Sequence, residues 1–137
     1  MSLKVELKAG EKLLIGNCVI TNSDQRTKLF IDGDAPILRE KDILTEKTAN
    51  SPAKQVYFAI QLMYLDDDIS KLRNEYFALS NDLLQAAPST LPFIDQLNNL
   101  ILTHDLYKAL RIAKKLIEYE TELLNATTSN PSLSTNG

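Results

Sequence analysis

The sequence has one cysteine and one histidine in 137 residues, which narrows the chemistry open to it. Cys18 has no second cysteine with which to form an internal disulfide, and its place in a strand-like stretch predicts a small buried hydrophobic residue. His104 has no serine or cysteine beside it and no second metal ligand, so we expect a surface or helix-capping residue. Neither residue indicates a metal site or a nucleophile.

Motifs that carry enzyme chemistry are also missing. The chain has no glycine-rich phosphate loop, no HExxH, no CxxC and no nucleophile elbow. The three consecutive carboxylates at 66–68 lack the further oxygen ligands and the glycine turn that a calcium loop requires, so helix capping accounts for them better. We therefore expect no enzymatic activity, no metal and no cofactor.

Long apolar runs and a basic excess are absent too. No apolar run is long enough to span a bilayer, and the N-terminus has no apolar signal region, which predicts a cytoplasmic protein with no membrane partner. Residues 1–49 hold 8 Lys/Arg and 8 Asp/Glu (8 − 8 = 0), and residues 50–137 hold 7 and 10 (7 − 10 = −3). Any RNA binding would therefore need a local basic patch rather than bulk charge.

The sequence does contain a change of hydrophobic period. Up to about residue 44, apolar residues such as Leu3, Val5 and Leu7 recur at every second position, as in half-buried strands. Four such stretches separated by turns predict an antiparallel meander, and a fifth strand near Arg39 is left open. So small a sheet needs a partner for its second face, either the helices or a second copy in a homodimer.

From about residue 50, apolar residues recur at every third or fourth position. Ser51 before Pro52 is typical of a helix start, and Val56, Ile60 and Met63 lie on one helix face. Similar patterns predict about four helices. The sequence thus predicts an α+β chain made of an antiparallel β module of four to five strands at 1–49, a C-terminal bundle of about four α-helices at 50–126 and a disordered tail at 127–137.

Four short stretches of the β region carry a resemblance to a known family. They are Leu3–Glu11, Leu14–Gly16, Asp34–Pro36 and Leu38–Glu40, and they look like parts of the carbon storage regulator family of small RNA-binding β proteins. That family is an intertwined dimer that grips a GGA-containing RNA hairpin through its first and fifth strands. By position, its central arginine resembles Arg39 and the basic end of its first strand resembles Lys8.

Longer motifs carry a second resemblance over nearly the whole chain. They are Ile37–Leu44, Ala53–Leu65, Asp82–Pro88 and Tyr107–Glu120. On these motifs, residues 3 to about 125 are similar to the FlbT family of flagellin synthesis regulators. The resemblance implies a protein that binds the 5′ untranslated region of flagellin mRNA and represses its translation or promotes its decay, although some members act positively. It also implies FlaF, a paired flagellar regulator, as a partner.

The residues themselves support an RNA site at the change of period. Arg39 would contact a base edge or a phosphate, because its planar fork can bond two acceptors at once. Lys8, Lys12 and Lys41 would bind phosphates of the flagellin mRNA leader. The alternative for the charged run at 39–42 is a solvated turn between apolar neighbours.

A second hypothesis is a protein-interaction adaptor or chaperone in flagellar assembly that acts through FlaF or flagellin without contacting RNA. The neutral first part and the acidic second part favour it. Lys108, Arg111 and Lys115, at i, i+3 and i+7, form one basic stripe that is a candidate partner surface. A solvated helix face is the alternative, because Glu118 lies within helix pairing distance of Lys115.

Overall fold

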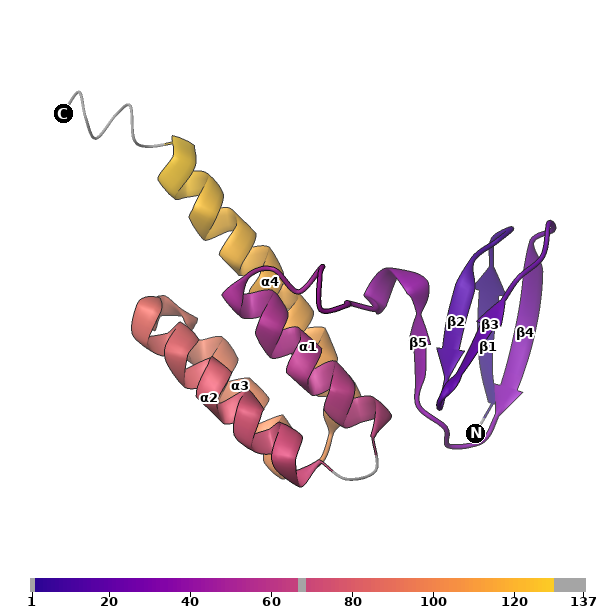
Figure 1. The fold of residues 1–137 in the computed structure, drawn as a ribbon, viewed down its shortest axis with the longest axis horizontal. Coiled ribbons are helices and arrows are strands. Elements are labelled where there is room, and N and C mark those ends of the chain that lie inside the picture. Colours follow the sequence, from indigo (N-terminus) through magenta and orange to yellow (C-terminus); the bar gives the residue numbers. More distant parts are fainter. Residues whose placement is uncertain (1, 67–68, 130–137) are drawn as a thin grey trace. The chain divides into compact units, whose positions relative to one another are not determined.

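The computed structural model describes residues 2–66 and 69–129 (Figure 1). Its contacts divide the chain into two compact units between Ile43 and Leu44. Of the predicted tail at 127–137, residues 127–129 continue the last helix, and the rest lies outside the described residues. Asp67 and Asp68, to which the sequence assigned a capping role, also lie outside them.

The first unit is built from short antiparallel strands, as the alternating pattern predicts. The elements are β1 (Ser2–Leu7), β2 (Lys12–Ile15), β3 (Cys18–Thr21), β4 (Thr27–Asp32), β5 (Ile37–Arg39) and the 3₁₀ turn η1 (Glu40–Asp42). The strand that the sequence left open is therefore present as β5. It lies at a sheet edge, which suits a strand that directly follows Pro36.

The predicted meander is wrong in its strand pairing. β1 pairs with β4 in one sheet, while β2 lies between β3 and β5 in a second sheet. Asn22, in the loop after β3, holds the chain in this arrangement. Its side-chain amide donates to the carbonyl oxygen of Lys8 at 2.8 Å and to that of Gln25 at 2.7 Å. It thereby joins the turn after β1 to the segment that leads into β4, and β4 returns beside β1.

The core of the first unit is shared by the two sheets. Val5 and Leu7 of β1 and Leu13 of β2 are buried, and partly buried side chains from both sheets pack around them: Ile15, Leu29, Ile31 and Ile37. Each sheet therefore covers the inner face of the other, as in a small sandwich. The sequence predicted that the small sheet needs a partner for its second face. Within the β unit, each of the two sheets provides that partner for the other.

Cys18 corrects another expectation, because it is exposed rather than buried. β3 lies at one edge of its sheet, and all four of its residues are exposed, including Val19 and Ile20. A strand that contributes nothing to the shared core gains no burial from its apolar pattern. A homodimer through such an open edge stays a prediction.

The second unit consists of the four predicted helices. They are α1 (Pro52–Leu65), α2 (Ser70–Ala86), α3 (Leu91–Leu102) and α4 (Leu106–Ser129). α1 packs against α2 and α4, and α3 packs against α4. Val56, Ile60 and Met63 of α1 are almost fully buried, which confirms their predicted core face.

Two buried polar side chains of this helical unit, Gln61 and Tyr76, have hydrogen-bond partners. Gln61 in α1 accepts a hydrogen bond from the backbone N–H of Leu44 at 2.8 Å and donates one to its carbonyl oxygen at 2.9 Å. Tyr76 in α2 donates to Asn98 of α3 at 2.8 Å, and burial raises the pKa of its hydroxyl far above the usual range.

The start of α1 is capped twice. Ser51 accepts from the backbone N–H of Lys54 at 3.2 Å, which confirms the predicted cap. Glu120 of α4 accepts from the Ser51 hydroxyl at 2.6 Å and from the backbone N–H of Ala53 at 2.9 Å. A carboxylate at this helix end satisfies free N–H groups and faces the positive end of the helix dipole.

The Glu120→Ala substitution should lower the free energy of unfolding by about 1.5–3 kcal/mol, because it removes two hydrogen bonds to a charged acceptor. Urea denaturation followed by circular dichroism measures the change. Glu122→Ala, at an exposed position on the same helix, is the matched control and should stay within about 0.5 kcal/mol. Equal stability of the two variants would show that the Glu120 cap contributes nothing.

Candidate nucleic-acid interface

The four predicted RNA-binding residues gather at one end of the β unit. Lys8 follows the last residue of β1, Lys12 opens β2, Arg39 ends β5, and Lys41 lies in η1. The antiparallel pairing of β2 with β5 sets Arg39 opposite Leu13, so Lys12 precedes the partner of Arg39. Four residues spread over 34 positions of the sequence thus share one rim.

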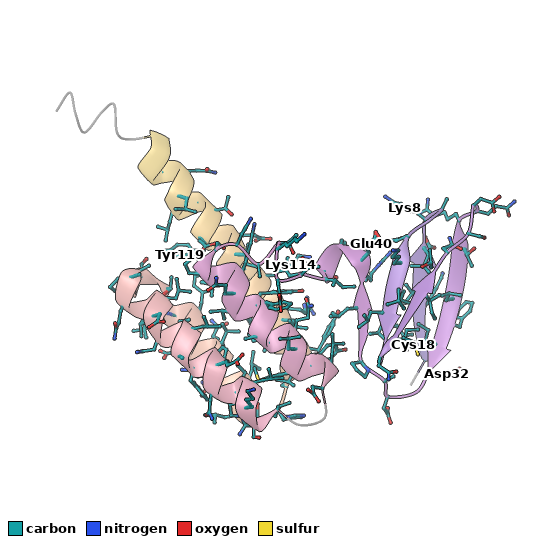
Figure 2. All side chains as sticks on the ribbon, viewed as in Figure 1. Lys8, Cys18, Asp32, Glu40, Lys114 and Tyr119 are labelled. Atoms are coloured by element: carbon teal, nitrogen blue, oxygen red, sulfur yellow. The ribbon has the colours of Figure 1, made fainter. Side chains whose placement is uncertain are left out.

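Figure 2 labels residues at both ends of the strands of the β unit. The labelled Lys8 and Glu40 lie at one end of the strands, and Cys18 and Asp32 lie at the other. Arg39 and Lys41 flank Glu40 in the chain. The sequence selected the four candidate RNA-binding residues although it gave the wrong pairing for the strands that hold them, and their RNA-binding role stays a prediction.

Arg39 joins the two sheets of the β unit. Its Nη2 donates to the carbonyl oxygen of Glu6 in β1 at 2.6 Å and lies 3.9 Å from the carboxylate of Glu11. The Arg39 side chain is 40% exposed and that of Glu11 is 17% exposed. Because β5 and β1 belong to different sheets, this guanidinium bridges the sandwich, and only part of it faces solvent.

The Nε atom of Arg39 is buried and has no hydrogen-bond partner among the described residues. An unsatisfied buried donor is costly, so the position of the guanidinium is set by its other contacts rather than by this atom. The bond to the Glu6 carbonyl oxygen, at 2.6 Å, is shorter than the 3.9 Å contact with the Glu11 carboxylate.

The three lysines differ from Arg39 in being exposed and unpaired. In the described part of the chain, no carboxylate lies within ion-pair distance of Lys8, Lys12 or Lys41. The rim also carries the carboxylates of Glu11, Glu40 and Asp42, so four cations and three anions give 4 − 3 = +1. The local charge is weakly positive, and phosphate contacts would have to come from individual lysines.

The predicted basic stripe lies on the outer side of α4. Lys108, Arg111 and Lys115 are exposed, while Leu110 and Leu116 on the opposite side are buried. The Nζ of Lys108 lies 3.6 Å from a carboxylate oxygen of Asp105, a pair that solvent weakens because the lysine side chain is 69% exposed. The stripe is a free surface of the helical unit as described.

The structure also bears on metals and membranes. Within residues 2–66 and 69–129, no three His, Cys, Asp or Glu side chains are grouped closely enough to hold a metal ion. Among the helices described, none has both the length and the apolar character that crossing a membrane requires.

Comparison with known proteins decides the family. Residues 3–124 match the family described as "Flagellar protein FlbT". This chain belongs to the FlbT family. A "Probable flagellum biosynthesis repressor protein FlbT 1" of Bradyrhizobium diazoefficiens is 56% identical over 90% of this chain and 85% of the relative. A "Probable flagellum biosynthesis repressor protein FlbT" of Rhodopseudomonas palustris is 52% identical over 91% of this chain and 99% of the relative.

More distant FlbT proteins match over a similar length. The "Flagellum biosynthesis repressor protein FlbT" of Caulobacter vibrioides is 35% identical over 96% of both chains. No solved structure matches the chain. The FlbT match spans both the β unit and the helical unit, so family membership alone does not say which unit carries the function.

Three residues at or near the site, Glu6, Glu11 and Phe30, were not among the candidate site residues predicted from the sequence. Glu6 and Glu11, the partners of Arg39, are far from it in sequence. The pairing of β2 with β5 and the packing of the two sheets bring them near. Phe30 is a large exposed aromatic on β4. Its signal was present in the sequence, because Phe30 falls on the charged side of an alternating strand, between Lys28 and Asp32.

Loss of the Arg39 bridge should destabilise this FlbT-family chain. Arg39→Ala removes a hydrogen bond from a charged donor, and we expect the free energy of unfolding to fall by about 1.5–3 kcal/mol. Lys41→Ala removes a neighbouring exposed cation and should change it by less than about 0.5 kcal/mol. Urea titration with amide hydrogen exchange locates the loss, which should fall in β1 and β5. An unchanged exchange pattern in those strands would refute the bridging role.

Proposed function

We propose that this chain lowers flagellin synthesis by binding the 5′ untranslated region of flagellin mRNA, which represses translation or promotes decay of the message. The names of its relatives describe repressors of flagellum biosynthesis, and a repressor that acts on a message needs an RNA-binding surface. The observation that carries the proposal is the gathering of Lys8, Lys12, Arg39 and Lys41 at one rim of the β unit.

In this proposal the rim residues divide the work of binding. The unpaired ammonium groups of Lys8, Lys12 and Lys41 bind phosphates as point charges. Arg39 has five N–H donors, of which those on Nη2 serve Glu6 and Glu11, so it contacts RNA through its solvent-facing part. Protein bound to the leader then competes with the ribosome for the same RNA.

Direct phosphate contact makes affinity depend on salt. We expect the Kd for flagellin leader RNA to rise steeply with added salt, because the logarithm of the association constant falls with the logarithm of the salt concentration with a slope near −0.7 per phosphate contact on single strands. Lys8→Ala should weaken binding and reduce that slope by about one contact. Fluorescence anisotropy over a salt series measures both quantities.

The matched control is Lys71→Ala, which removes an exposed lysine from α2 and should leave both the Kd and the slope unchanged. If wild-type protein binds the leader without salt dependence, or does not bind it at all, direct reading of the message is wrong. If Lys8→Ala and Lys71→Ala behave alike, RNA binding does not use this rim.

A second candidate function is that of an adaptor that acts through FlaF or flagellin. The observation that favours it is the exposed stripe of Lys108, Arg111 and Lys115 on α4, which suits an acidic partner surface. In this case the effect on the message passes through the partner.

The adaptor function predicts that the double substitution Arg111→Glu with Lys115→Glu weakens FlaF binding at least about tenfold, because like charges then meet at the interface. Isothermal titration calorimetry measures the change. Lys54→Glu on α1 is the control and should leave FlaF affinity unchanged. Equal affinity of the double variant and wild type would remove the stripe from any FlaF interface.

A further inference from the structure

Among the described residues of the β unit, Phe30 is the most exposed large hydrophobic side chain. It lies in the middle of β4 with 69% of its surface open to solvent. The neighbours of Phe30 along the strand, Leu29 and Ile31, turn inward and pack on the shared core. Alternation in a strand therefore fixes Phe30 on the outer face of the β1–β4 sheet. A ring with no polar atom gains nothing from this position in the isolated chain.

The surroundings of Phe30 are charged rather than apolar. The register sets Lys4 directly opposite Phe30, and Lys28 opposite Glu6. Directly opposed side chains have Cβ atoms about 4.5–5.5 Å apart. Lys4 is exposed and, among the described residues, forms no ion pair, so its ammonium group is open to a ligand beside the ring.

Further cations continue the same face toward the rim. Arg26 and Lys28 reach the carboxylate of Glu6 at 3.5 and 4.0 Å, and their side chains are 68% and 59% exposed. Exposed pairs at such distances are weak and are readily exchanged for a phosphate. Glu6 can neutralise only one of the two cations. Lys8 directly follows β1. At the usual rise per residue of a strand, it lies about 13 Å from Lys4 along the chain.

We propose that the outer face of the β1–β4 sheet is a single-strand RNA platform, on which one base stacks on Phe30 while Lys4 and Lys28 hold the adjoining phosphates. The proposal rests on the proposed function, since it names where on the β unit the flagellin leader lies. It extends the site from the rim onto the outer face of the β1–β4 sheet.

The chemistry of this face fits RNA better than a protein. Proteins that bind single strands commonly pair aromatic rings, which stack on bases, with cations that follow the backbone. A protein-docking patch would instead surround the ring with other apolar side chains. On this sheet the outward positions next to Phe30 are Lys4, Lys28 and Asp32, so the ring stands alone among charges.

The test measures binding of the full chain to a single-stranded oligouridylate of about 12 nucleotides, a length within the range that one small β domain covers, and to the flagellin leader RNA. Phe30→Ala should raise both Kd values by about 5- to 150-fold, which is the loss of affinity expected when a ring that stacks on one base is removed. Phe30→Tyr keeps the ring and should bind within about twofold of wild type. Phe30→Leu keeps apolar bulk without a ring and should bind nearly as weakly as Phe30→Ala.

Tyr107→Ala is the matched control, because it removes a ring that is 53% exposed on α4 and should leave both affinities unchanged. Circular dichroism establishes that each variant is folded, as expected for a side chain outside the core. A duplex of the same length should bind more weakly than the single strand, since its bases are not free to stack on the ring.

The remaining outcomes distinguish failure of the Phe30 platform from failure of the proposed RNA-binding function. If wild type binds leader RNA and Phe30→Ala binds equally well, the platform is wrong while the proposed function stands. If wild type binds neither RNA, the proposed function fails together with the platform. If Phe30→Leu binds like wild type, or if Phe30→Ala alters only the mass in light scattering, Phe30 is an apolar protein contact and the platform is overturned.

Discussion

The packing of two very small sheets against each other is the constraint on which the β unit depends. A two-stranded sheet is marginally stable at best alone in water, and so small a sheet needs apolar packing on one face. Burial of Val5, Leu7 and Leu13 between the sheets fixes which face of each strand points inward. Every outward position then follows by alternation, and this is why Phe30 and Lys4 come to share the outer face of β1–β4.

The same constraint gives Arg39 its part in the structure. The Arg39 guanidinium links β5 to the Glu6 carbonyl oxygen and so helps to hold the two sheets together. The N–H group that makes this bond is then not available to contact RNA. The exposed lysines of the rim have no such structural duty. On the proposed function, RNA recognition is spread over exposed lysines and an aromatic ring, and Arg39 positions the surface as well as contributing charge.

Much of the helical unit could be predicted from the sequence, because helical signals are local. Ser51 and Pro52 marked the start of α1, and the spacing of Val56, Ile60 and Met63 marked its buried face. The contact of Glu120 with the start of α1 could not be predicted, because it depends on how α1 packs against α4 and not on the local sequence around either residue.

The β unit was less predictable for the same physical reason. Alternation identified the strands and their inward residues, but strand pairing depends on distant contacts such as those of Asn22. Cys18 was expected inside because its pattern is apolar, and only the place of β3 at a sheet edge shows that it is exposed. Of the rim cations, Arg39 and Lys8 were selected through family resemblance and Lys12 and Lys41 from the charged residues near them. The face around Phe30 needed the register of β1 with β4.

Ultraviolet crosslinking of the full chain to flagellin leader RNA, followed by mass spectrometry of the attached peptides, tests most directly whether the β unit touches the message. Contact through the sandwich predicts nucleotide adducts on the peptide that contains Phe30 and on peptides of the rim around Lys8 and Lys12. Adducts confined to α4, or no adducts under conditions in which the protein binds the leader, would contradict direct recognition by the β unit.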